Sequence, residues 1–179
     1  LMSQAVPRVR YVLPLAATAP EARVRSLAAE AQVPVEVVSG GAYEVLTAAD
    51  LALVASGTAT LETALLGTPM VIVYRLARLT YFLGRRLIRV PHIGMANLLA
   101  EEALFPELIQ DAATAENMAA AALGIIRRPE RLAQVRAGLR RMVERLGGPG
   151  ASRRAALEVM KVLGRHEKSE ADKQGGQGK

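Results

Sequence analysis

The sequence predicts an α/β fold in which a parallel sheet is covered by helices on both faces. Two observations support this prediction: short apolar runs rich in Val and Leu recur in the first half of the chain, and segments with helical spacing separate them. Apolar runs without polar alternation are typical of strands that are buried on both faces, as parallel strands usually are. After Tyr74 the spacing is helical throughout, which predicts a helical C-terminal extension.

The expected elements follow in order along the chain. Strands are expected at the apolar runs 9–15, 35–38, 51–55 and 70–74. Helices are expected between them at 20–31, 42–49 and 59–66, and after them at 79–88, 114–127, 129–145 and 151–163, with a short turn near 97–105. Pro129 suits the start of a helix, and the Gly-Gly-Pro-Gly segment at 147–150 suits a break between the last two.

Composition limits the class of protein further. At 179 residues and 51% hydrophobic, the chain is long enough for one domain with a core, and we expect that domain at 1–164. It has no cysteine, which excludes disulfides and thiolate metal sites. No apolar run approaches the roughly 18 residues that a membrane-spanning helix needs. Residues 165–179 have no apolar face, so we expect a disordered basic tail there.

The positive charge is concentrated in the C-terminal part of the chain. Residues 127–179 carry 14 Lys and Arg against 6 Asp and Glu, whereas residues 1–126 are slightly acidic. Aromatic residues make up only 3% of the chain, and no known nucleic-acid-binding motif accompanies the arginines, so we expect no nucleic-acid partner. A solvated basic face, or one that meets an anionic lipid surface, fits this pattern better.

Polar residues interrupt the chain where three of the expected strands end. The breaks are Ser39-Gly40-Gly41, Ser56-Gly57-Thr58 and Tyr74-Arg75. Ligands of open parallel sheets bind beyond the carboxyl ends of the strands, so these breaks are the candidate binding positions.

The second break leads directly from a buried strand into a helix. Gly57 permits a tight turn, the helix offers free N–H groups, and Ser56, Thr58 and Thr60 add hydroxyl groups, which together suit a phosphate or diphosphate. Glu62, one turn further on, has a carboxylate that can accept hydrogen bonds from two vicinal hydroxyls. The alternative is that Ser56 or Thr58 caps the helix and Glu62 complements its dipole; spacing alone does not decide between them.

The blocks "ASGTATLETALLGTPMVIVYR", "LTYFLGRRLI", "NLLA" and "FPELIQ", in this order, resemble the C-terminal half of lipid-A-disaccharide synthase. That family consists of inverting glycosyltransferases with two Rossmann-like domains, the GT-B fold. The specific blocks cover about 55–110, and a weaker similarity extends from about 8 to 163. The resemblance therefore implies a Rossmann-like, UDP-sugar-binding domain that corresponds to the C-terminal half of a GT-B fold.

The resemblance also implies roles for individual residues. Those expected to cradle the UDP diphosphate are Ser56, Gly57, Thr58 and Thr60. Glu62 would bind the ribose, while Arg75 and Asn97 would face the donor sugar and phosphates. The residues themselves leave two simpler alternatives, a surface arginine at Arg75 and a turn or cap residue at Asn97.

The implied reaction transfers a glycosyl group from UDP-2,3-diacylglucosamine to 2,3-diacylglucosamine 1-phosphate, with release of UDP, in lipid A biosynthesis. Resemblance implies no cofactor and a cytoplasmic protein at the inner membrane, and the sequence has no Asp-x-Asp metal signature. The helix expected at 79–88 mixes apolar and basic residues, so it suits either a membrane surface or an ordinary core position. His92 and His166 lack partners at triad or metal-ligand spacing. A homodimer is a further expected partner.

The sequence departs from the family in four places. Before "NLLA", Met95 and Ala96 stand where a proline is usual. Glu101 and Glu102 follow "NLLA" where the family usually has glycine and arginine. Nothing corresponds to the N-terminal domain, which would bind the acceptor and supply the catalytic carboxylate, so no catalytic residue is expected in this chain. The first strand of the C-terminal domain is also not matched. That strand would lie between the strands at 9–15 and 51–55, so we expect two unpaired edges there and marginal stability.

Two other functions stay open at this point. The chain fits a non-catalytic nucleotide-binding module or remnant, which would bind UDP without transfer. It also fits a relative of UDP-N-acetylglucosamine 2-epimerase, which has similar Ser-Gly and Glu residues, although "NLLA" and "FPELIQ" argue against that isomerase.

Overall fold

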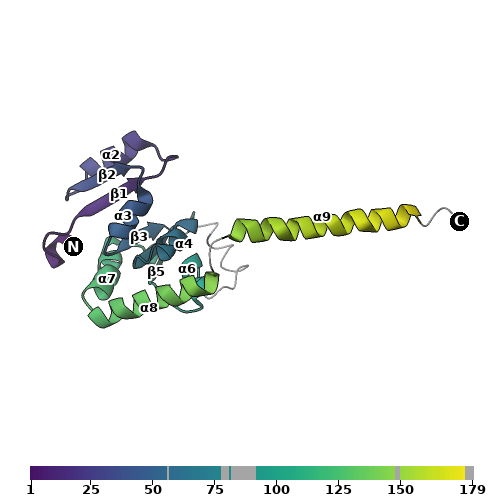
Figure 1. Ribbon diagram of the computed structural model, residues 1–179. Coiled ribbons are helices and arrows are strands. Elements are labelled where there is room, and N and C mark those ends of the chain that lie inside the picture. The colour runs from purple at the N-terminus through teal and green to yellow at the C-terminus, as the bar shows by residue number, and fades with distance from the viewer. Residues whose placement is uncertain (56, 78–80, 82–91, 148–149, 176–179) are drawn as a thin grey trace. The chain divides into compact units, whose positions relative to one another are not determined.

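A computed structural model describes residues 1–55, 57–77, 81, 92–147 and 150–175 (Figure 1). It shows the predicted α/β architecture of parallel strands flanked by helices, with a long helix at the C-terminus. The chain divides into two compact units, Leu1–Val143 and Glu144–Lys179. All the strands described below belong to the first unit.

Five strands in the described part of the chain form two parallel sheets. In the first, β1 (Tyr11–Leu15) pairs with β2 (Val35–Ser39). In the second, β4 (Met70–Tyr74) lies between β3 (Ala52–Ala55) and β5 (Glu107–Ile109). The four predicted strands are confirmed to within two residues at each end. Strand β5 was not predicted, because a segment as short as Glu-Leu-Ile is too short to show a period.

The helices also follow the predicted order. Their bounds are α1 Met2–Ala5, α2 Glu21–Ala29, α3 Ala42–Ala48, α4 Thr58–Leu65, α6 Met95–Ala100, α7 Ala115–Ile126, α8 Pro129–Leu146 and α9 Ala151–Gly175, with a short 3-10 turn at Gln110–Ala112. Pro129 begins α8 as predicted. The helix expected at 79–88 lies outside the described residues apart from Tyr81. A turn was expected near 97–105, but its first residues belong to α6.

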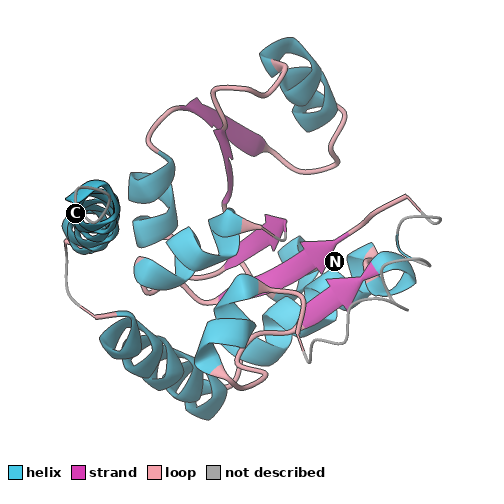
Figure 2. Ribbon diagram, turned by 90° about the vertical axis from the view of Figure 1, so that its right-hand side faces the viewer, coloured by secondary structure: helices cyan, strands magenta, loops and turns pink. Residues whose placement is uncertain are grey.

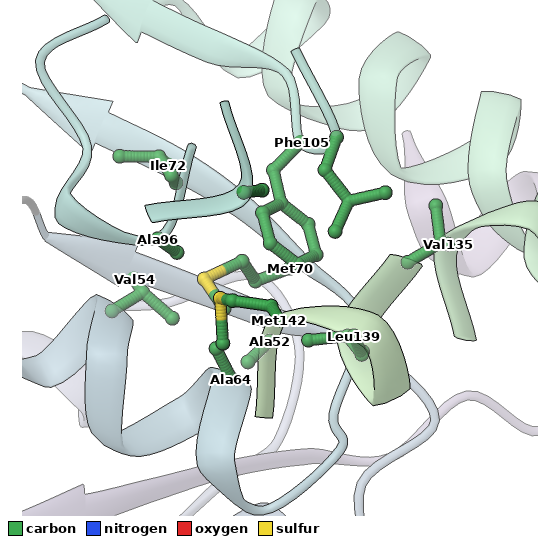
Figure 3. Packing of buried hydrophobic residues seen from close by; sticks show 12 residues of the cluster. Ala52, Val54, Ala64, Met70, Ile72, Ala96, Phe105, Val135, Leu139 and Met142 are labelled. Atoms are coloured by element: carbon green, nitrogen blue, oxygen red, sulfur yellow. The ribbon is translucent and has the colours of Figure 1, made fainter. Parts of the chain in front are cut away.

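The core is built on both faces of β4. Met70 and Ile72 point to one face, where residues of α4, α6 and α8 pack against them (Figure 3). Figure 2 shows the helices, in cyan, next to the strands, in magenta. Val71 points to the other face and packs with Ala122 and Ile125 of α7. Successive side chains of a strand alternate between faces, so an apolar run such as Met-Val-Ile is what a doubly covered strand requires.

Strands β1 and β3 each have one edge without a partner among the described residues. Strand β1 pairs with β2 alone, and β3 pairs with β4 alone. These are the edges that the sequence analysis expects to be unpaired. Apolar side chains next to them are uncovered: Leu13 of β1 is 41% exposed and Leu53 of β3 is 57% exposed. Parallel strands normally bury both faces, so this exposure is unusual.

We expect the chain to unfold over a broad temperature range with a low enthalpy. Unpaired edges and exposed strand residues reduce the number of interactions that are lost together on unfolding. Differential scanning calorimetry measures this directly. A sharp transition with the ordinary enthalpy of about 0.7 kcal/mol per residue near 60 °C would contradict the expectation.

The second unit is dominated by α9, which extends to Gly175. A disordered tail was expected from residue 165, so the structure differs from the prediction in this segment. The segment has no apolar face, but Ala, Glu and Lys favour helix locally even without tertiary contacts. The domain boundary expected at residue 164 stays a prediction. None of the helices among the described residues combines the length and apolarity that crossing a membrane requires.

Candidate functional site

The carboxyl ends of β3, β4 and β5 meet at one edge of the sheet. Strands β3 and β4 are parallel and in register, with Ala55 opposite Val73, and β5 continues the sheet with Ile109 opposite Tyr74. Neighbouring strands lie about 4.8 Å apart, so the segments that follow them are close in space. The predicted break after β3 and Arg75 after β4 therefore lie at the same edge, as the sequence analysis expects.

The N-terminus of α4 follows β3 at this edge of the sheet. Gly57 precedes the helix with φ 145° and ψ −161°, a backbone conformation that is almost restricted to glycine. No side chain among the described residues caps the helix, so its first N–H groups, those of Thr58 and Ala59, have no partner there. Ser56 lies outside the described residues. An exposed, uncapped helix start next to a glycine turn suits an anionic group.

Helix α4 presents two of the predicted residues to solvent on one side. Thr58 and Glu62 are both exposed, and positions four apart lie on the same face of a helix. The carboxylate of Glu62 has no hydrogen bond or ion pair with any other described residue. The hydroxyl of Thr58 and the carboxylate of Glu62 are thus free to contact a ligand along this face.

Thr60, which the resemblance implies as a diphosphate contact, lies inside the protein. Its side chain is fully buried, and its hydroxyl donates a hydrogen bond of 2.8 Å to the carbonyl oxygen of Gly57. This hydrogen bond fixes the carbonyl group of Gly57, the residue that forms the turn before α4. The Thr60 hydroxyl is therefore engaged with the backbone in this structure, and its contact with a diphosphate stays a prediction.

Arg75 is exposed directly after β4. No carboxylate or carbonyl among the described residues pairs with its guanidinium. An unpaired cation at the edge that holds an uncapped helix N-terminus adds to the positive field there. The arrangement favours an anion over a neutral ligand.

Asn97 is the clearest departure from the predicted site. Its side chain is fully buried in α6, and its Nδ2 donates to the Phe105 carbonyl at 2.9 Å and to Glu107 Oε1 at 2.8 Å. Its Oδ1 accepts from the Phe105 N–H at 2.9 Å. With both amide protons and the oxygen used inside the protein, direct contact with a donor sugar has no support here. The hydrogen bonds of Asn97 instead hold the segment that precedes β5 against α6.

Glu107 extends this network to the loop before α6. Its carboxylate accepts hydrogen bonds from the backbone N–H groups of Ile93 and Gly94, at 2.8 and 3.1 Å. His92 lies beside it, with Nδ1 4.0 Å from Oε1. Glu107 thus holds the start of α6 in place. The N–H groups of Ile93 and Gly94, which could otherwise bind an anion, already donate to its carboxylate.

No metal centre is present among the residues that the structure describes, since no three His, Asp or Glu side chains cluster there. Two surface hollows that described residues line lie away from the sheet edge, one beside α2 and β2 and one between α7 and α8. Neither hollow includes a residue of the predicted site.

Comparison with known proteins decides the family. The family model described as lipid-A-disaccharide synthetase matches residues 1–162. The chain belongs to the lipid-A-disaccharide synthetase family. It is 41% identical over 164 residues to the lipid-A-disaccharide synthase of Syntrophus aciditrophicus, covering 91% of this chain and 43% of that relative. The synthases of Geobacter metallireducens (42%; 92% and 43% covered) and Pseudomonas putida GB-1 (40%; 90% and 42% covered) are similar to the same extent. The chain spans less than half the length of these relatives.

The two glutamates that depart from the family pattern have defined places. Glu101 ends α6 in the left-handed conformation, with φ 57°, where a glycine is conformationally favoured. Glu102 forms an ion pair with Arg141 of α8 at 2.9 Å, so its charge is compensated on the protein. The negative charge of this glutamate pair is therefore partly neutralised on the protein.

Two residues that hydrogen-bond to the backbone near this edge of the lipid-A-disaccharide synthetase domain were not predicted from the sequence. They are Glu107 and Gln110, and both lie in the block "FPELIQ" that carried the resemblance. Their partners are backbone groups, which leave no trace in the spacing of side chains. A polar residue at each end of the two-residue apolar stretch Leu108-Ile109 was the only available signal.

Replacing Gly57 with alanine is expected to destabilise the chain by about 1–3 kcal/mol, because its φ of 145° is strained for any side chain. The new Cβ would meet no atom within 4 Å, so the effect is conformational and not steric. Urea unfolding measures it. Gly124→Ala in α7 is the matched control: its site is equally open and has helical φ, so this change is expected to be neutral or slightly stabilising. Equal effects of Gly57→Ala and Gly124→Ala on the free energy of unfolding would contradict the strain assigned to position 57.

Proposed function

We propose that this chain is the UDP-sugar-binding part of a lipid-A-disaccharide synthase. The observation that carries the proposal is the exposed, uncapped N-terminus of α4, with Thr58 and Glu62 on its outer face and Arg75 on the neighbouring strand end. Family membership supports the reaction class, because the relatives are named for forming this disaccharide.

The diphosphate of the donor would lie at the start of α4. There the N–H groups of Thr58 and Ala59, the Thr58 hydroxyl and the Arg75 guanidinium offer hydrogen bonds and positive charge. The carboxylate of Glu62, one turn along the same face, would accept hydrogen bonds from the two ribose hydroxyls. Ser56 stays a proposed diphosphate contact from sequence alone.

The chemistry of glycosyl transfer needs such a site. An acceptor hydroxyl attacks the anomeric carbon while the bond to UDP breaks, and negative charge grows on the departing diphosphate. Fixed N–H groups and an arginine stabilise that charge more in the transition state than in the bound donor, which lowers the barrier. The base that takes the proton from the acceptor would be a carboxylate outside this chain.

The lipid character of the substrates extends the proposal to a membrane surface. The donor would be UDP-diacylglucosamine and the acceptor an acylated glucosamine phosphate. The basic, apolar segment 79–88 would lie at the lipid surface, on the evidence of its composition alone. A homodimer is part of the same proposal and rests on no contact described above.

The test is to incubate the isolated chain with the UDP-linked donor and the acceptor. We expect saturable donor binding without release of UDP or formation of disaccharide, because the acceptor-binding and basic groups would be elsewhere. Disaccharide formation by this chain would contradict the proposed division of roles. A folded chain that does not bind the donor would refute the binding function itself, and conversion of UDP-N-acetylglucosamine to its epimer would favour the isomerase.

A further inference from the structure

Gln110 joins the two chain segments that follow β4 and β5. Its Oε1 accepts a hydrogen bond of 2.7 Å from the backbone N–H of Leu76, and its Nε2 donates one of 3.1 Å to the Leu76 carbonyl. The last backbone pair of the two strands is Tyr74 with Ile109. The side-chain amide of Gln110 therefore acts like one more peptide unit and continues the pairing beyond the end of the sheet.

This contact lies next to Arg75, the cation that the described residues contribute to the proposed diphosphate site. Arg75 stands between Tyr74, which is held in the ladder, and Leu76, which Gln110 holds. The backbone of Arg75 is thus fixed on both sides, while its guanidinium has no partner among the described residues. An arginine that is held before the ligand arrives loses less freedom on binding.

The backbone of Gln110 supports a specific role for its amide. Gln110 adopts φ 52°, a left-handed conformation that is uncommon for residues other than glycine. Only a side chain with both a donor and an acceptor at this reach can bond the N–H and the carbonyl of one residue together. A glutamate keeps the acceptor but loses the donor, and a methionine of similar length loses both.

From these observations we infer that Gln110 is a positioning residue for diphosphate binding, which acts by fixing the backbone of Leu76 and hence of Arg75. This inference rests on the proposed function. A merely structural residue would affect UDP binding whether or not Arg75 is present. The effect of Gln110 on UDP binding, in contrast, requires Arg75.

A double-mutant cycle with UDP affinity as the readout tests the inference. By calorimetry, Gln110→Met is expected to weaken UDP binding by about 3- to 10-fold and Arg75→Ala by about 10-fold or more. In the Arg75→Ala chain, adding Gln110→Met is expected to have no further effect. Gln134→Met, an exposed glutamine on α8, is the control and should bind UDP as the unmodified chain does.

Four results would overturn the inference. UDP affinity unchanged by Gln110→Met would refute it, and so would independent effects of the two substitutions that multiply in the double variant. Amide hydrogen exchange adds a readout without ligand: Gln110→Met should remove protection of the Leu76 N–H, and retained protection would refute the contact. Failure of the unmodified chain to bind UDP would instead refute the proposed function, and this inference would fail with it.

Discussion

Glu62→Ala is expected to lower the affinity for UDP by about 10- to 100-fold. The carboxylate would accept two hydrogen bonds from the ribose, and hydrogen bonds to a charged group contribute about 1.5–3 kcal/mol. Glu62 is exposed and has no partner among the described residues, so its loss should leave stability unchanged. Calorimetric titration with UDP gives the affinity, and urea unfolding of the same samples gives the stability.

Two comparisons make this prediction specific. Glu144→Ala removes an exposed helical glutamate from α8 and should not change UDP affinity beyond a weak effect of overall charge. Titration with a ligand that lacks the ribose, such as inorganic diphosphate, should be insensitive to Glu62→Ala. If Glu62 only complements the dipole of α4, both substitutions will leave UDP affinity unchanged, and the assigned ribose contact will be wrong.

Asn97→Ala is expected to destabilise the chain by about 2–4 kcal/mol. The substitution leaves the buried N–H and carbonyl of Phe105 without partners and removes one donor from Glu107. Each buried polar group that loses its partner costs about 1–3 kcal/mol, and water can compensate only in part. Urea unfolding should show the loss, and a variant without a folded state would be the extreme form of it.

The control for this prediction is Asn117→Ala. Asn117 is exposed, and its Nδ2 donates one hydrogen bond, to the Ala112 carbonyl at 3.0 Å. Its replacement should cost less than about 1 kcal/mol. If Asn97→Ala weakened UDP binding while the free energy of unfolding stayed the same, Asn97 would contact the ligand after all, and its burial in the unliganded chain would not describe the bound state.

Sequence was sufficient for the elements with a clear period. The strands at the two apolar runs 51–55 and 70–74 are confirmed, and so is the order of the helices among the described residues. The helix expected at 79–88 stays a prediction. Strand β5 was missed, since three residues show no alternation. The helix through Gly175 was missed for another reason: a polar segment with helix-favouring residues has no apolar face, so composition alone favours disorder.

The sequence placed the candidate site residues along the chain but did not predict which of them are buried. Thr58, Glu62 and Arg75 are exposed near the expected edge, because strand ends and helix starts follow from the pattern. Thr60 lies two residues from Thr58 and is buried, and Asn97 is buried as well, since the side of a short helix that faces the core depends on packing. Gln110 was missed because its partners are the backbone groups of Leu76.

The most direct test of the account is a calorimetric titration of the unmodified chain with UDP and, separately, with uridine. If this edge of the sheet is a diphosphate site, UDP binds saturably and uridine binds much more weakly, because the N-terminus of α4 and Arg75 would recognise the diphosphate. Circular dichroism of the same sample shows whether the chain is folded. A folded chain that binds neither ligand, or that binds both equally, would contradict the claim that this edge of the sheet is a diphosphate site.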